Sequence, residues 1–312
     1  MLKIGVQTGG LDDRFGVDEA YRMIAEAGFD AVDANLDHFM SGRAILKDFI
    51  LPEPFRPGLD ERDMLEFFKP YRDAAKKYGL DNYQAHAPFP SFHVTEDLPE
   101  WNDVLLEMLR KTLIGCASIG CRNLVIHPFF MDYDHRLTRE QEWELNISRY
   151  SALAATARQY GITINLENMF VTHGGKLYAA CCNNGQTAAA YVDELNRLAG
   201  ARCFGFCLDT GHALLVGLDI LEFMRDLGKR ITCFHIHDND GRDDLHEAPY
   251  TGQLDWNRFV QGLAETGFGG TLCFETHRAV LKVDPALIPE TLHYIAACGR
   301  LFARRAEEFK KS

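Results

Sequence analysis

Short apolar runs and longer amphipathic stretches alternate about eight times along this 312-residue chain. The short runs are rich in β-branched and aromatic residues, a composition that favours strands. They cover residues 3–9, 31–36, 82–89, 123–129, 162–169, 204–211, 231–239 and 270–277. The amphipathic stretches repeat apolar residues at helical spacing. They cover residues 18–27, 61–78, 98–119, 138–160, 187–199, 219–228, 255–266 and 286–308.

Glycines mark the predicted ends of several helices. Four strands follow a glycine by a few positions, in the segments "EAGFD", "KYGLD", "SIGCRN" and "QYGIT". Glycine often ends a helix because it adopts the left-handed conformation without a steric penalty. No stretch of different composition separates the strand–helix units, and "LPEPFRPGLD" (residues 51–60) is expected to be a long loop. The sequence therefore predicts an α/β fold, a single (β/α)8 TIM barrel domain that spans residues 1–312.

Composition and charge restrict the classes of partner. The longest apolar runs fall far short of the roughly 18 residues that span a membrane, and "MLKIGVQTGG" has no secretory hydrophobic region. Nine cysteines, an odd number that includes adjacent Cys181 and Cys182, suit reduced thiols and a cytoplasmic location. A net charge of −12 with no basic cluster argues against nucleic-acid binding.

Titratable residues stand at the ends of six consecutive predicted strands, the third to the eighth. They are His86, His127, Glu167, Asp209, His237 and Glu275. In a TIM barrel the carboxyl ends of the strands form the active face, so these side chains are expected to meet at one rim. One such residue would fit a hydrogen-bonded core histidine or a helix cap, but six in register do not fit those explanations together.

Carboxylates and imidazoles crowded at one rim repel each other unless a cation, a proton or a tight network compensates. Oxygen and nitrogen ligands favour one divalent ion such as Mn²⁺, Mg²⁺, Co²⁺ or Zn²⁺. His235 and His237 point inward together because strand side chains alternate. We favour His237 as the ligand because it is nearer the strand end, and we expect His235 to be a deeper supporting residue.

Other histidines and cysteines are expected to be structural. His38, His135 and His293 fall in loops or a helix without partner patterns, which is typical of surface residues. The cysteines at positions 203, 207, 233 and 273 occur early in strands and lack CxxC spacing, so they are expected to fill the core.

The ordered segments "HAPF", "HPF", "LEN", "LDTGH", "HIHDNDG" and "FET" resemble the xylose isomerase-like TIM-barrel superfamily over nearly the whole chain. Its sugar isomerase/epimerase branch matches best. In the related ketose 3-epimerases, a Glu, an Asp, a His and a second Glu hold one divalent ion. The resemblance implies that the ligands here are Glu167, Asp209, His237 and Glu275, and that the two glutamates are the catalytic acid/base pair.

The same resemblance implies residues that contact substrate. His212 matches a substrate-contacting histidine, and Arg242 lies within one residue of the position of an arginine against substrate oxygens. His86, His127 and His246 are expected to contact substrate or to support the ligands. The implied reaction is isomerisation or epimerisation of a sugar or sugar phosphate, by proton transfer next to a carbonyl through a metal-stabilised enediolate. The expected partner is a small carbohydrate or cyclitol.

Three alternatives stay open. The chain resembles endonuclease IV more distantly, a phosphodiesterase with three Zn²⁺ ions. The positions that could supply its ligands are His86, His127, Glu167, Asp209, His212, His237, Asp244, His246 and Glu275. A metal-dependent dehydratase of the inosose or dehydroshikimate type would use the same base and ion, and a non-catalytic binding protein is the third alternative. Barrels of this kind commonly pair through exposed helices or loops, so a homo-oligomer is compatible with the sequence.

Overall fold

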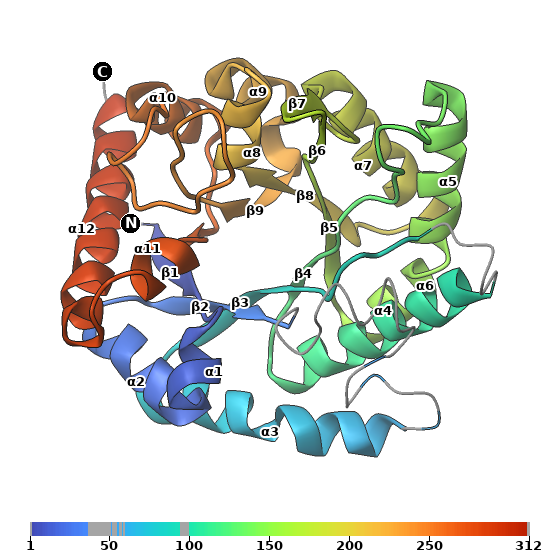
Figure 1. The fold of residues 1–312 in the computed structure, drawn as a ribbon. Coiled ribbons are helices and arrows are strands. Elements are labelled where there is room, and N and C mark those ends of the chain that lie inside the picture. The colour runs from blue at the N-terminus through green and yellow to red at the C-terminus, as the bar shows by residue number, and fades with distance from the viewer. Residues whose placement is uncertain are drawn as a thin grey trace.

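Eight parallel strands form a barrel in the computed structural model, which describes residues 2–36, 51, 55, 58, 60–93 and 100–310 (Figure 1). The strands, in sheet order, are β10 (Thr271–Phe274), β1 (Lys3–Gln7), β2 (Ala31–Asn35), β3 (Asp81–His86), β4 (Asn123–Val125), β5 (Thr163–Glu167), β8 (Phe204–Asp209) and β9 (Ile231–His235). A bridge beyond β9 completes the ring, because Ile236 N–H donates to Cys273 O at 2.9 Å and Glu275 N–H donates to Ile236 O at 3.0 Å. The predicted TIM barrel is confirmed.

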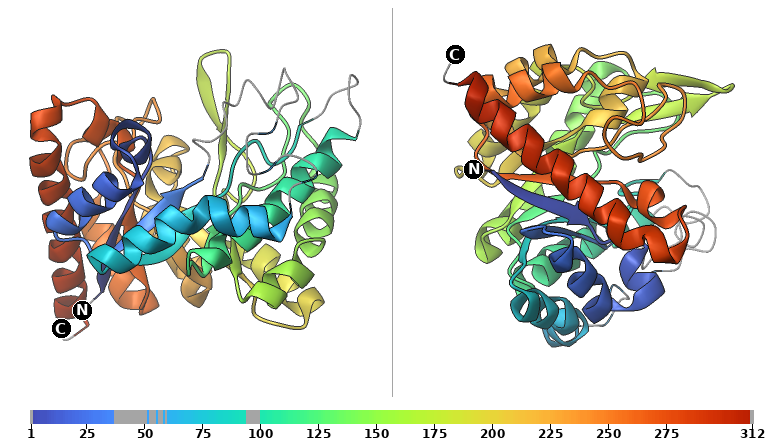
Figure 2. Two further views of the ribbon diagram at one scale, coloured as in Figure 1. Left: turned by 90° about the horizontal axis from the view of Figure 1, so that it is seen from below. Right: turned by 90° about the vertical axis from the view of Figure 1, so that its left-hand side faces the viewer.

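Helices surround the barrel on its outside (Figure 2). The longer ones are α2 (Val17–Glu26), α3 (Glu61–Tyr78), α4 (Trp101–Ser118), α5 (Arg139–Ser151), α6 (Ala154–Tyr160), α7 (Gly185–Ala199), α9 (Ile220–Leu227), α10 (Trp256–Thr266) and α12 (Ile288–Phe309). Short helices are α1 (Leu11–Phe15), α8 (Thr210–Leu215) and α11 (His277–Leu281), with 3-10 turns at Gly228–Arg230 and Pro285–Leu287. The single helix predicted over residues 138–160 is wrong, since the chain breaks it into α5 and α6.

Local sequence signals explain where the helices begin and end. Asp60 and Thr138 begin α3 and α5 with capping boxes. In each box the side chain of the capping residue accepts the backbone N–H three residues later, and the side chain of that later residue accepts the backbone N–H of the capping residue. Gly79 and Gly161 follow α3 and α6 in the left-handed conformation, with φ of 70° and 67°. The glycine signals therefore identified these helix ends correctly.

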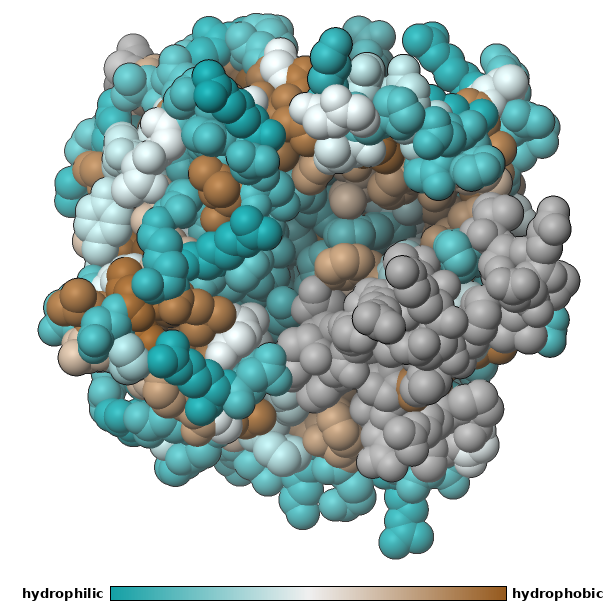
Figure 3. Space-filling view, in the orientation of Figure 1, coloured by the Kyte–Doolittle hydropathy of each residue, from teal (hydrophilic) through white to brown (hydrophobic). Residues whose placement is uncertain are grey.

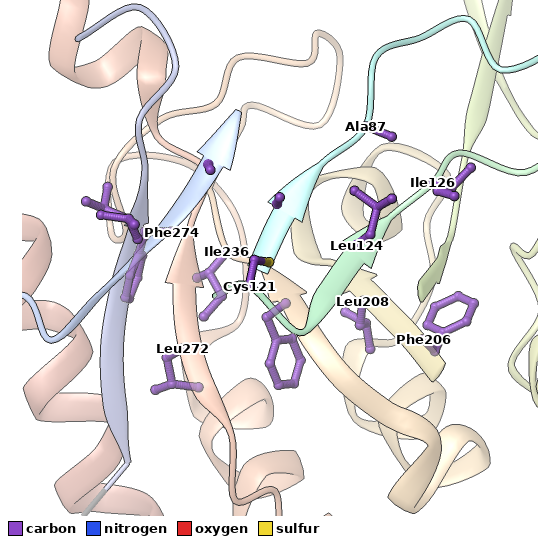
Figure 4. Close-up of a cluster of buried hydrophobic side chains, with 14 of the residues drawn as sticks. Ala87, Cys121, Leu124, Ile126, Phe206, Leu208, Ile236, Leu272 and Phe274 are labelled. Carbon is purple, nitrogen blue, oxygen red and sulfur yellow. The ribbon is translucent and has the colours of Figure 1, made fainter. Parts of the chain in front are cut away.

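The core lies between the barrel and its helices. Figure 4 shows strand side chains that contribute to it, among them Leu124, Phe206, Leu208, Leu272 and Phe274. All nine cysteines are buried and free of disulfides, which agrees with the expectation that the four strand cysteines fill the core.

A two-stranded hairpin follows β5 and was not predicted. It consists of β6 (Phe170–His173) and β7 (Lys176–Ala179), joined through Gly174 and Gly175. It projects beyond the strand ends of the barrel (Figure 2). Its strands are only four residues long and none of their residues is buried, so they lack the buried apolar run that identifies the barrel strands.

Two expectations fall on residues outside the described part of the chain. His38 lies there, and so do six of the ten positions of the loop at 51–60. Among the helices that the structure describes, none has both the length and the apolar character needed to cross a membrane.

Candidate metal centre

The strand ends bring the predicted titratable residues to one face of the barrel. His86, Glu167 and Asp209 are the last residues of β3, β5 and β8, and Glu275 directly follows β10. In the space-filling view, hydrophilic residues line a hollow near the centre of this face (Figure 3). All four side chains are buried, so carboxylates from distant parts of the chain share a site with little solvent.

A central group of four residues has the geometry of a metal site. The group consists of Glu167, Asp209, His235 and Glu275, and one ligand atom from each lies within 4.8 Å of the others. Nδ1 of His235 is 2.7 Å from Oε1 of Glu167 and 3.5 Å from Oε2 of Glu275. Three of the four members are the carboxylates that the sequence predicted.

The histidine of this group is His235, whereas sequence analysis favoured His237. Strand β9 ends at His235, so His237 already belongs to the loop above the rim. The Nε2 atom of His237 lies 3.1 Å from both carboxylate oxygens of Asp209. His237 therefore lies beside the central group and belongs to two further candidate groups, one with Asp209 and His212 and one with Asp244 and His246.

Further donors extend the cluster on the side of β3 and β4. The Nε2 atoms of His86 and His127 lie 3.0 Å apart, and that of His127 is 3.3 Å from Oε2 of Glu167. Glu167 thus contacts His235 through one oxygen and faces a histidine pair with the other.

The other extension lies on the loop after β9. Oδ2 of Asp244 is 2.9 Å from Nε2 of His246 and 3.7 Å from Nε2 of His212. His277, which sequence analysis did not single out, joins His246 and Glu275 in a further candidate group. The donors therefore form one chain across the mouth of the barrel.

Arg242 is the predicted site residue that the structure does not bring into the cluster. Its side chain is exposed, and its backbone N–H donates to Oδ1 of Asp240 at 2.9 Å. Among the contacts of the described residues, none joins its guanidinium to the carboxylates of the centre.

Polar residues on the first two strands also belong to the site, and sequence analysis missed them. Gln7 on β1 donates from Nε2 to Oε1 of Glu275 at 2.8 Å. On β2, Oδ2 of Asp33 lies 3.2 Å from Nε2 of His235. The signal was present, because Asp33 is an acidic residue in the middle of β2 and Gln7 is a polar residue at the end of β1.

Asn168, the residue after β5, fixes the neighbouring strand end. Its side chain donates to Asp209 O and accepts from Asp209 N–H, both at 2.9 Å. Oδ1 of Asp209 in turn accepts the backbone N–H of His212 at 2.6 Å and begins α8. The segments "LEN" and "LDTGH" are therefore bound to each other at the rim.

Two aromatic rings flank the mouth. The ring centroid of Phe89 lies 4.9 Å from that of His127, and the centroid of Phe170 lies 5.0 Å from that of His212. Phe89 is 39% exposed, so its ring is available to a molecule that enters the hollow.

The two glutamates of the centre have displaced pKa values of opposite sign. Burial raises the pKa of Glu275 to about 7. Burial also acts to raise the pKa of Glu167, but the adjacent His235 and His127 lower it well below its usual value. At neutral pH, Glu167 is therefore ionised and Glu275 lies near its midpoint. Such a split is typical of an acid/base pair.

The histidines respond to the same carboxylates. Burial acts to lower the pKa of His235, but the negative groups around it, with Glu275 and Glu167 among them, raise it well above the usual value. His86 has no such excess of negative neighbours, and burial together with His127 lowers its pKa to about 3.

The donor set fits a divalent cation. Among the residues that the structure describes, none donates a hydrogen bond to the buried Oε2 of Glu167 or Oδ1 of Asp244, which is costly for a carboxylate oxygen unless a cation satisfies it. Mixed carboxylate and imidazole donors suit Mn²⁺, Co²⁺ or Zn²⁺. The four members of the central group are the residues that would hold such an ion.

A parallel eight-stranded barrel with this donor cluster at its strand ends defines a TIM barrel with a candidate metal centre. The chain belongs to the family described as xylose isomerase-like TIM barrel, whose model matches residues 21–298.

Curated relatives match part of the chain. An uncharacterised protein of Sinorhizobium fredii is 26% identical over 212 residues, which cover 66% of this chain and 61% of that protein. Inosose isomerase of Bacillus subtilis is 24% identical over 183 residues, 57% of this chain and 61% of that protein. The chain thus spans about three fifths of the length of both relatives.

Solved structures share the fold over nearly the whole chain. A D-allulose 3-epimerase from Methylomonas sp., in complex with D-allulose, has a TM-score of 0.71 at 21% identity and covers 97% of both chains. A 3-keto-D-glucoside 4-epimerase from E. coli has a TM-score of 0.67 at 16% identity and covers 96% of this chain and 100% of its own.

Proposed function

We propose that this protein is a divalent-metal-dependent isomerase or epimerase of a sugar, a sugar phosphate or a cyclitol. The observation that carries the proposal is the central group, in which Glu167 and Glu275 are both buried and have pKa values displaced in opposite directions. The proteins of similar fold that act on D-allulose and a 3-keto-D-glucoside, and the inosose isomerase relative, support this substrate class.

The two glutamates divide the proton transfer between them. Glu167, ionised at neutral pH, removes a proton from the carbon next to the substrate carbonyl. Glu275, which holds a proton near neutral pH, returns one to the opposite face in an epimerisation or to the neighbouring carbon in an isomerisation. A bound divalent ion would polarise the carbonyl oxygen as a Lewis acid. Asp209 and His235 would hold that ion without taking part in proton transfer.

The remaining polar residues are proposed to orient the substrate. His86, His127, His212 and His246 present ring nitrogens around the central group, where they can hydrogen-bond sugar hydroxyls. Arg242 stays a proposed contact for substrate oxygens outside the hollow, since its side chain is exposed on the loop after β9.

Exchange of substrate hydrogen with solvent tests this function. The protein, loaded with Mn²⁺, is incubated in D2O with a panel of ketoses, ketose phosphates and cyclitols, and deuterium at each carbon is measured by NMR. We expect exchange next to the carbonyl of at least one substrate, and its loss when a chelator is added. No exchange in any member of the panel by metal-loaded, folded protein would contradict the proposal. Loss of water from a substrate would indicate a dehydratase that uses the same residues.

A second candidate is a multi-metal phosphodiesterase like endonuclease IV. The specific observation in its favour is that donors continue on both sides of the central group, with His86 and His127 against Glu167 and with Asp244 between His212 and His246. The net charge of −12 opposes a nucleic-acid substrate.

Metal analysis and a strand-cleavage assay separate the two functions. The isomerase proposal expects about one ion per chain, whereas the phosphodiesterase expects about three. Incision of DNA that contains an abasic site, together with about three zinc ions, would favour the second candidate. Three ions without incision would leave the isomerase as the better account.

A further inference from the structure

Asp33 is a buried carboxylate to which the proposed chemistry gives no role. It lies in the middle of β2, and none of its surface is exposed. Removing a carboxylate from water costs several kcal/mol unless partners compensate. A buried charge in the barrel interior therefore requires an explanation from its contacts.

The contacts of Asp33 lead to the central group. Its Oδ2 accepts a hydrogen bond from Nε2 of Gln84 at 2.7 Å and lies 3.2 Å from Nε2 of His235. Strands β2 and β9 are not neighbours in the sheet, so the approach of Asp33 to His235 crosses the barrel interior. The same Gln84 amide donates to Phe234 O at 3.1 Å, and this bond ties Asp33 to the strand that carries His235.

The two nitrogens of the His235 ring face different surroundings. Nδ1 faces the central group, 2.7 Å from Glu167 and 3.5 Å from Glu275, and Nε2 faces Asp33. A histidine binds a metal through an unprotonated nitrogen, and the partner of its other nitrogen selects the tautomer and fixes the ring. When an ion at the centre replaces the proton on Nδ1, a carboxylate beside Nε2 keeps a proton on that nitrogen and leaves the Nδ1 lone pair to the ion.

We propose that Asp33 is a positioning residue, held by Gln84, that orients His235 so that Nδ1 presents its lone pair to a divalent ion at the centre. The inference rests on the proposed function, because it assumes that the central group binds an ion. Asp33 itself contacts neither the ion nor the substrate; it acts through the ring of His235.

Metal affinity tests the role without an assay of turnover. The protein is stripped with a chelator and titrated with Mn²⁺ by calorimetry, as wild type and as Asp33→Asn. Loss of a carboxylate partner of a metal-binding histidine typically weakens metal binding by about 10- to 100-fold, and we expect an increase of that size in the Kd. Gln84→Leu, which keeps the carboxylate but removes its clamp, should weaken binding in the same direction by a smaller factor.

Asp30→Asn is the matched control. Asp30 lies directly before β2, accepts the Ile4 backbone N–H at 2.8 Å and pairs with Arg300 at 2.7 Å, away from the centre. We expect this change to lower the melting temperature and to leave the Mn²⁺ affinity unchanged. A ring-nitrogen NMR spectrum of the Zn²⁺ form adds a direct readout, since wild type should show His235 protonated at Nε2 and Asp33→Asn should lose that uniform state.

The outcomes separate this inference from the proposed function. If wild type binds no divalent ion, the proposed function fails and the inference fails with it. If wild type binds Mn²⁺ and folded Asp33→Asn binds it within about twofold, Asp33 is a structural residue and only the inference fails. Should Asp33→Asn not fold, unchanged affinity in folded Gln84→Leu would overturn the inference in the same way.

Discussion

Nδ1 of His235 lies 2.7 Å from Oε1 of Glu167, although the two residues are 68 positions apart and stand on strands β9 and β5. The contact places an imidazole among three buried carboxylates at the mouth of the barrel. Without a cation, the ring compensates their charge only while it is protonated. The proton and a divalent ion therefore compete for the same position.

The geometry of His235 and His237 predicts that they contribute unequally to metal binding. His235→Asn removes a donor of the central group, so we expect Mn²⁺ affinity to fall by more than the about 10- to 100-fold typical of a supporting residue. His237→Asn should have a smaller effect, because its ring contacts only Asp209 of that group. Calorimetric titration of the chelator-treated variants measures both. A larger loss of Mn²⁺ affinity in His237→Asn than in His235→Asn would instead support His237 as the ligand, as the sequence predicted.

Glu167→Gln and Glu275→Gln should each remove nearly all turnover. The amide keeps the size of each side chain but cannot exchange a proton, and general acid–base catalysis commonly contributes about 10²- to 10⁴-fold. Deuterium exchange into the substrate identified by the panel measures the loss, and circular dichroism checks the fold. Glu194→Gln, on a half-buried position of α7 where the side chain pairs with Arg197, serves as the control and should exchange normally. Near-normal rates in either active-site variant would rule out the acid/base assignment.

The barrel and the carboxylates of its centre were predictable because both follow from local patterns. Eight apolar runs indicated the strands, and the position of Glu167 or Glu275 at the end of a run placed it at the rim. The choice between His235 and His237 was not predictable in this way, because alternation points both inward. It depends on the contacts that each ring makes across the barrel, since His235 reaches Glu167 and Glu275 whereas His237 reaches Asp209.

Site residues on the first two strands were missed for a different reason. Asp33 and Gln7 belong to the site through contacts with His235 and Glu275, which are distant in sequence. A search for polar residues at strand ends passes over a carboxylate in the middle of a strand. The cost of burying it was the available signal, since an acidic side chain in an apolar strand needs a partner.

The metal-free protein should lose stability as the pH rises from 6.5 to 8.5. Burial raises the folded pKa of Glu275 from 4.5 to about 7, so its contribution is fully present below pH 4.5 and declines as the pH rises from 4.5 through 7. His235, whose folded pKa is well above 6.5, contributes stability that is lost as the pH rises from 6.5 toward that folded pKa, so it accounts for most of the loss in this range. His86 has the opposite effect on stability, because its folded pKa is lowered from 6.5 to about 3. It lowers the stability as the pH falls below 6.5 and has no effect on the alkaline side.

Added Mn²⁺ should reverse or flatten this alkaline loss, because the ion binds more tightly when fewer protons compete for the donors. Thermal unfolding at pH 6.5 and 8.5, with chelator and with excess Mn²⁺, gives the four melting temperatures required. We expect the increase caused by Mn²⁺ to be larger at pH 8.5. An equal or larger increase at pH 6.5 would argue against an ion that displaces protons from the centre.

The final prediction concerns Gly211 and the packing of side chains at the rim of the barrel. It lies in the first turn of α8, and a Cβ atom built there would overlap the imidazole of His237. His237 is fully buried and cannot move aside into solvent. Helix propensity alone would make Gly211→Ala stabilising by about 1 kcal/mol, whereas overpacking costs about 1–3 kcal/mol. The sign of the measured change therefore decides which effect dominates.

We expect overpacking to dominate, so that Gly211→Ala lowers the free energy of unfolding in urea and moves His237 away from Asp209. Gly269→Ala is the matched control, because a Cβ at Gly269 meets no atom within 4 Å and its φ is not positive. It should leave stability unchanged or slightly higher, since alanine restricts the unfolded chain. A Gly211→Ala protein as stable as wild type would mean that the rim at His237 adapts to an added methyl group. The close approach of α8 to that histidine would then not explain the glycine of "LDTGH".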